Sequence, residues 1–213
     1  MEEISYKCEA VSRAAFIQQF AISYVQHGYW FYVKGTIPDR KDPIKTDQKI
    51  IGQYQIGISK WARARRKQSG KANLQYLRYQ NFFVIVATKG RNEFFEKENQ
   101  VKDIRKTPLK FAGYSIGYRF GQGRFHASVR LELSRYKDLK AYFESRACHL
   151  SIDNLMREFQ SLKLLGYAPV RWQMFNILRA VNRKRDLMGY EHVPKEAVYF
   201  VRYQVKPFEK AAA

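Results

Sequence analysis

The sequence predicts an α+β fold, in which a mixed or antiparallel sheet of about five strands is packed by several helices, with a basic helical hairpin. Two observations support this class. Hydrophobic residues make up 46% and aromatic residues 15% of the 213-residue chain, which is enough for one hydrophobic core and far above the content of a disordered basic tail. Helical and strand-like patterns also alternate, in the order helix, strand, two helices, strand, hairpin, three helices, strand.

The N-terminal part is expected to hold three helices and one strand. Ser12 can cap a first helix, which Gly28 ends. The aromatic and β-branched segment YWFYV that follows is typical of a buried strand. Two further helices are expected over residues 44–54 and 59–69, with Gly70 in the position of a C-terminal cap.

The remaining elements begin with a central strand. The segment NFFVIVATKG, residues 81–90, is apolar on both faces, as strands in the middle of a sheet are. Two alternating runs joined by Gly121-Gln122-Gly123 predict a β-hairpin. The other expected elements are helices at about 136–147, 151–162 and 170–188 and a closing strand at 197–205.

No internal repeat or long linker divides the chain. We therefore expect a single compact domain over residues 1–210, within which residues from about 134 to 189 can form a helical subdomain. Residues 211–213, a run of alanines after a lysine, resemble a cloning remnant.

The charge balance is strongly basic. Lys and Arg number 39 against 19 Asp and Glu, a formal net charge of +20. Such an excess repels itself in a folded chain and usually persists where the partner is a polyanion, above all nucleic acid. The longest apolar runs, such as residues 82–87, are too short to span a bilayer, and no signal segment opens the chain. We expect a soluble, cytoplasmic protein with no membrane partner.

The positive charge is concentrated in one segment. Between Asp47 and Glu93 the sequence has no acidic residue. A helix without a partner usually mixes charge signs, because opposite charges at i,i+4 stabilise it and like pairs such as Arg63 and Lys67 do not. The alternative is a solvated helix whose acidic partners come from elsewhere in the fold. The basic residues of the segment are Lys49, Lys60, Arg63, Arg65, Arg66, Lys67, Lys71, Arg78, Lys89 and Arg91.

The helix at 59–69 is the predicted phosphate-binding element. We expect Trp61, with Ala62 or Ala64, to hold this helix on the core. Phosphate contacts release counterions, so affinity should fall steeply with salt. The residues expected to contact nucleic acid here are Lys60, Arg63, Arg65, Arg66, Lys67 and Lys71.

The segment DQKIIGQYQIGISKWARARR resembles the central part of a helix-turn-helix motif. Its first helix is followed by Gly57 at the turn and by Ile58-Ser59 leading into the second helix. The recognition helix of that motif buries an aliphatic residue about six positions after the turn glycine, where this sequence has Arg63.

The hairpin offers a second candidate surface. With a three-residue loop, Phe120 pairs with Arg124, and Phe125 lies on the opposite, core-facing side. Aromatic residues interleaved with cations favour a platform on which unpaired bases stack. The alternative is that a helix covers this face, and a shift of one residue would exchange the two faces. The expected binding face carries Tyr114, Tyr118, Phe120, Arg124, His126 and Arg130.

Two kinds of chemistry remain open. Asp39, Glu132 and Asp138 stand near predicted strand ends or on the following helix, where carboxylates could hold Mg²⁺ against a phosphodiester. Tyr136 and Lys140 stand one helical turn apart, which resembles the nucleophile motif of rolling-circle initiators and relaxases. Those proteins also carry a His-hydrophobe-His metal motif, which is absent from this sequence.

These patterns predict a nucleic-acid-binding protein, with DNA favoured over RNA, that acts in mobile-element or plasmid DNA processing. Two alternatives stay open. One is a nuclease that uses Mg²⁺ or a tyrosine nucleophile, and the other is a structural RNA-binding component of a ribonucleoprotein.

Overall fold

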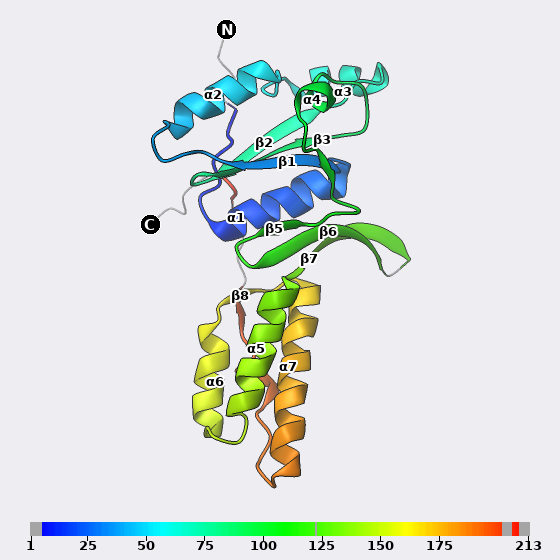
Figure 1. Ribbon diagram of the computed structural model, residues 1–213. Coiled ribbons are helices and arrows are strands. Elements are labelled where there is room, and N and C mark those ends of the chain that lie inside the picture. The colour runs from blue at the N-terminus through cyan, green and yellow to red at the C-terminus, as the bar shows by residue number, and fades with distance from the viewer. Residues whose placement is uncertain (1–5, 122, 202–205, 209–213) are drawn as a thin grey trace. The chain divides into compact units, whose positions relative to one another are not determined.

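The computed structural model describes residues 6–121, 123–201 and 206–208 (Figure 1). It confirms the α+β class, with seven α-helices among these residues and sheets of four, three and two strands instead of one sheet of about five. The described chain divides into a first unit (6–109, 116–127 and 206–208) and a second unit (110–115 and 128–201). The second unit includes residues 134–189, whereas residues 211–213, which resemble a cloning remnant, lie outside the described residues.

The expected N-terminal helix is present. It starts as α1 (Arg13–Gln18), continues as the π-helical η1 (Gln19–Tyr24) and ends in the 3₁₀ turn η2 (Val25–His27) before Gly28. The Ser12 hydroxyl caps α1 by accepting a hydrogen bond from the Ala15 amide at 3.1 Å.

An antiparallel four-stranded sheet organises the first unit. Its order is β2 (Leu74–Tyr79), β3 (Phe82–Ala87), β1 (Phe31–Thr36) and β4 (Lys102–Asp103). The expectation that 81–90 forms a central strand is confirmed, because β3 pairs with both β1 and β2. β2 was not predicted, because its polar residues Gln75 and Arg78 break an apolar pattern and are buried through polar partners instead.

Helices cover both faces of this sheet (Figure 1). On one face, α1 contacts β3 through the rings of Phe16 and Phe82, whose centroids are 5.6 Å apart. Alternate strand residues point to the other face, toward α2 (Pro43–Gln53) and the short α4 (Phe94–Lys97). The buried cluster on that face contains Cys8, Tyr54, Ile56, Leu74, Tyr76, Ile85, Ala87 and Phe94.

The predicted hairpin is a sheet of three strands, β5 (Leu109–Phe111), β6 (Tyr114–Gly121) and β7 (Arg124–Leu131). The alternating run that precedes Gly121 in the sequence, residues 110–120, predicts a single strand. It is broken because Ala112 and Gly113 both have positive φ, 50° and 78°, as the two central residues of a type I′ turn do.

The second unit contains the three expected helices, α5 (Leu133–Arg146), α6 (Ile152–Ser161) and α7 (Ala168–Leu187). The rings of Phe143 and Phe159 stack between α5 and α6, with centroids 3.9 Å apart. The remaining elements are β8 (Leu164–Leu165), the 3₁₀ turn η3 (Lys195–Ala197) and β9 (Phe200–Val201), which pairs parallel to β8. Residues 202–205 of the expected closing strand lie outside the described residues.

Buried Arg185 ties the end of α7 to its surroundings. Its guanidinium donates to the carbonyl oxygens of Ala147 at 2.6 Å, Leu150 at 3.1 Å and Glu191 at 2.6 Å. Part of the basic charge of α7 is therefore structural.

No helix in the described part of the chain has the length and apolar character needed to cross a membrane.

Candidate nucleic-acid interface

The basic helix α3 (Lys60–Gln68) lies on the surface of the first unit and has no buried residue. The Ser59 hydroxyl caps its first turn by accepting from the Ala62 amide at 3.2 Å. The prediction that Trp61 holds this helix on the core is wrong, because the Trp61 side chain is 78% exposed. Polar contacts hold the helix instead, including the Asn73 amide, which donates to the Arg63 carbonyl at 3.0 Å.

Two of the predicted phosphate-binding arginines turn back toward the protein. Arg63 donates to the Ile58 carbonyl at 2.8 Å, and Arg66 donates to the side-chain oxygen of Gln55 at 2.7 Å. Both side chains are half-buried. They therefore brace the connection between α2 and α3, and are less available to a ligand than the exposed basic residues of the same helix.

The other basic residues share the outer half of α3. At 100° per residue, the half-buried Ala62, Arg63 and Arg66 fall on one side of the helix and the exposed residues fall on the other. This outer half extends past the helix end, because the Arg91 amide donates to the Gly70 carbonyl and the Ala72 amide to the Arg91 carbonyl, both at 3.0 Å. The bridge places the backbone of Arg91 beside that of Lys71.

We define the basic surface by the exposed Lys and Arg residues, together with Trp61, in two segments, residues 60–71 and residues 89–91. No described Asp or Glu lies within 4.0 Å of the charged nitrogen of any of its basic residues. The predicted imbalance of charge is therefore present in three dimensions. The basic surface consists of Lys60, Trp61, Arg65, Lys67, Lys71, Lys89 and Arg91.

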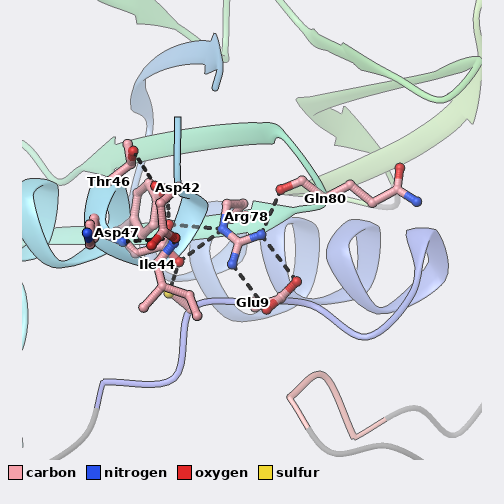
Figure 2. Close-up of polar contacts among 10 residues, drawn as sticks. Glu9, Asp42, Ile44, Thr46, Asp47, Arg78 and Gln80 are labelled. Atoms are coloured by element: carbon pink, nitrogen blue, oxygen red, sulfur yellow. Dashed lines mark hydrogen bonds and ion pairs between the residues drawn. The ribbon is translucent and has the colours of Figure 1, made fainter. Parts of the chain in front are cut away.

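Arg78 belongs to the same acid-free segment but does not contribute to this surface. It is 3% exposed, and its Nε donates to the Asp47 carboxylate at 2.9 Å. Its Nη atoms reach Glu9 and the Gln80 carbonyl, so all three guanidinium nitrogens have partners (Figure 2). A cavity of about 680 Å³ borders this cluster and is also lined by Ile44 and Tyr79.

Burial and Asp47 together raise the pKa of two neighbouring side chains, Cys8 and Tyr76. Burial, followed by the charge of Asp47, raises the pKa of Cys8 to about 12. Burial and the hydrogen bond that Tyr76 donates to Asp47 at 2.6 Å raise the pKa of Tyr76. Both side chains are held neutral near pH 7, and we assign this cluster a structural role.

The resemblance to a helix-turn-helix motif breaks down at residue 63, where the sequence already departs from the motif. Arg63 stands in the place of the buried aliphatic residue, and its guanidinium satisfies the Ile58 carbonyl. α3 therefore lacks the buried apolar side chain with which a recognition helix packs on its partner helix.

The predicted faces of the hairpin are wrong near its tip. β6 ends at Gly121 and β7 starts at Arg124, which leaves two positions between the strands instead of three. The rings of Tyr118 and Phe125 stack with centroids 5.8 Å apart, so Phe125 lies on the aromatic face and not on the core side. The one-residue difference in loop length explains the exchange, because successive residues of a strand point to opposite faces.

The predicted hairpin site is also divided between the two units. Tyr114 and Arg130 belong to the second unit, where Tyr114 is buried and its hydroxyl accepts from the Leu165 amide at 3.2 Å. Tyr118, Arg124 and His126 belong to the first unit. Tyr114 is thus ordinary core, as the alternative interpretation held.

The candidate catalytic residues do not form a common site. Asp39 lies in the first unit and accepts from the Asn81 side-chain amide at 2.7 Å, whereas Glu132, Tyr136 and Asp138 belong to the second. Glu132 approaches Lys110 at 3.8 Å. Lys140, the expected partner of Tyr136, approaches Glu144 at 3.9 Å. Among the residues described, no group of three or more His, Cys, Asp or Glu could hold a metal ion.

Two functional candidates were missed by the sequence reasoning. The exposure of Trp61 could have been anticipated from the helical wheel, because Trp61 falls between Lys60 and Arg65 on the charged half of α3. The contact of Trp30 with the hairpin had no signal in the sequence, because it joins segments far apart in the chain.

No family model, curated protein or solved structure matches this chain.

Proposed function

We propose that the protein binds nucleic acid through the basic surface, with DNA favoured over RNA, in the processing of mobile-element or plasmid DNA. The observation that carries the proposal is the set of six exposed Lys and Arg side chains that have no carboxylate partner among the described residues. Like charges on one surface repel one another, and a row of phosphates relieves that repulsion.

The exposed indole of Trp61 supports the same function. A large apolar ring on a charged helix costs free energy in water unless a ligand covers it. Trp61 is flanked by Lys60 and one turn from Arg65, so a ligand held by those charges would meet the ring. Sugars and bases of nucleic acid have the apolar faces that such a ring can cover.

The test reverses the charge of three exposed positions of the basic surface. The variant Arg65→Glu/Lys67→Glu/Lys71→Glu should bind nucleic acid more weakly than the natural sequence and with a flatter salt dependence. Each lost phosphate contact lowers the slope of log affinity against log salt by about 0.9 on duplex DNA. A matched control is Lys137→Glu/Arg183→Glu/Lys195→Glu, which makes the same change in net charge at exposed positions of the second unit.

Equal loss of affinity in both triple variants would mean that net charge alone attracts the ligand, and would remove the basic surface from the account. The same titrations carried out on duplex DNA and on RNA of the same sequence test the preference for DNA. Incubation with Mg²⁺ and a labelled strand tests the nuclease alternative, since a binding module leaves the strand intact.

A further inference from the structure

The hairpin tip carries a continuous row of aromatic rings. Trp30, which precedes β1, contacts Tyr118 with ring centroids 5.6 Å apart, and Tyr118 stacks on Phe125 at 5.8 Å. Phe125 in turn meets Phe120 edge-on at 5.2 Å. We call Trp30, Tyr118, Phe125 and Phe120 the aromatic row; all four belong to the first unit.

The inner end of the row is fixed. The Arg105 guanidinium lies over the Trp30 ring at 4.5 Å and is itself held by Asp103 at 2.6 Å. The Gln26 side chain accepts from the Ala127 amide at 2.8 Å, which ties β7 to the N-terminal helix. These contacts position the hairpin tip before any ligand arrives, so binding there would cost little ordering.

The outer end of the row is open. Phe120 is 65% and Phe125 57% exposed, whereas Trp30 and Tyr118 are half-buried. Two neighbouring phenylalanines at the end of a hairpin contribute little to a core at this exposure. Their rings therefore offer an apolar face that the described part of the chain leaves uncovered.

The charge around the open rings selects the ligand. Arg119 and Arg124 are the chain neighbours of Phe120 and Phe125 and point to the opposite face of the two strands; both are exposed, and neither contacts a carboxylate among the described residues. The strands β6 and β7 contain no Asp or Glu. The exposed rings thus lie on strands whose charged side chains are all basic, which suits a chain that alternates flat apolar bases with phosphates.

We propose that the hairpin tip binds unpaired nucleotides, whose bases stack on Phe125 and Phe120 while the positive charge of Arg119 and Arg124, on the other face of the strands, attracts the phosphates. In a duplex both faces of each base are covered by neighbours, so a base can stack on these rings only where the strand is single or opened. The inference rests on the proposed function for the identity of the ligand, but not on the basic surface for its binding site.

The experiment compares a short oligothymidylate with a duplex of the same length. Phe120→Leu and Phe125→Leu should each weaken binding of the single strand by about 5- to 150-fold, and should leave binding of the duplex unchanged. Phe125→Trp should retain single-strand binding. The matched control is Trp172→Leu, which removes an aromatic ring of similar exposure from the second unit.

A second readout can be taken on the natural protein alone and then repeated on a variant. A single strand that contains the fluorescent base 2-aminopurine should lose emission when it binds the natural protein, because stacking on an aromatic ring quenches it. The Phe125→Leu complex should recover emission. Unchanged emission on saturated binding would overturn the proposal even if the leucine variants proved unstable.

The outcomes separate this inference from the proposed function. Unchanged single-strand affinity in the leucine variants, or an equal loss for single strand and duplex, overturns stacking and leaves the basic surface untouched. Loss of single-strand binding in the leucine variants but not in Arg65→Glu/Lys67→Glu/Lys71→Glu supports the aromatic row and contradicts the basic surface. Binding of neither ligand by the natural protein contradicts both.

Discussion

Arg78 in β2 and Arg65 on α3 come from one acid-free stretch of sequence, yet one is buried with partners and the other is exposed. Arg78 is buried in β2, and all its nitrogens have partners, chiefly the Asp47 carboxylate. Arg65 on α3 is exposed and has no carboxylate partner among the described residues. A buried charge with partners in the fold and an exposed charge without a carboxylate partner thus stand close together in the sequence.

The difference teaches that a count of charges overstates a binding surface. Of the ten basic residues between Asp47 and Glu93, Arg78 is neutralised inside the first unit, and Arg63 and Arg66 are turned toward the backbone and side chain of the α2–α3 connection. Burial requires a partner for a charge, because an uncompensated ion in the interior is costly. An exposed charge does not require a partner, so the basic residues without a carboxylate partner are those on the surface.

The largest expected effect tests the buried half of this comparison. Asp47→Ala should lower the free energy of unfolding by about 3–5 kcal/mol, because it leaves the buried Arg78 without its main counter-charge. Urea denaturation measures the change. Glu9→Gln, at the exposed end of the same cluster, should cost less than about 1 kcal/mol. Similar losses in the two variants would contradict the central place of Asp47.

Raising the pH should weaken the same cluster. Burial and the neighbouring Asp47 raise the pKa of Cys8 from 9.0 to about 12. The unfolded chain loses this proton near pH 9 while the folded chain keeps it, so the stability is fully present below pH 9 and is lost as the pH rises through 12. Tyr76, whose pKa is raised by burial and then by Asp47, acts in the same direction.

Denaturation at a series of pH values on both sides of 9 checks this expectation. The Cys8→Ala variant should lose stability less steeply with pH, because one of the titrating groups is gone. An identical pH dependence in the variant and the natural sequence would show that Cys8 does not contribute.

A smaller effect is expected where the backbone brings the two segments of the basic surface together. A Cβ at Gly90 would lie 2.6 Å from the Ala72 amide nitrogen, so Gly90→Ala should cost roughly 1–3 kcal/mol for the clash. Gly70→Ala is the control for a positive φ without a clash, since Gly70 has φ 68° and nothing within 4 Å of an added Cβ, whereas the φ of 145° at Gly90 adds backbone strain to the clash. Thermal unfolding of both variants measures the difference, and equal destabilisation would argue against a close approach at Gly90.

The smallest effect on stability is expected at Trp61. Because its side chain is 78% exposed, Trp61→Ala should change the free energy of unfolding by less than about 0.5 kcal/mol. Burial on the core, as the sequence suggested, would instead make the loss about 3–5 kcal/mol. Chemical denaturation separates these outcomes, and a loss of nucleic-acid affinity without a loss of stability would place Trp61 at the interface.

Much of the helical structure could be predicted because its signals are local. Ser12 and Ser59 cap their helices with hydroxyls that reach amides three residues along the chain. The strand β2 was missed because its burial depends on distant partners such as Tyr6, whose hydroxyl donates to the Gln75 side chain at 2.7 Å. The prediction assigned residues near the hairpin tip to the wrong faces, because the strand register depends on whether the loop has two or three residues.

By itself, the sequence determined the net charge, the α+β class and the position of the acid-free segment, because composition, periodicity and capping involve residues that are neighbours in the chain. Only the tertiary structure decided that Arg78 meets Asp47 in the interior, that Trp61 faces outward and that Phe125 joins Tyr118. The physical reason is that burial and pairing depend on which distant residues meet, and a local pattern does not specify those contacts.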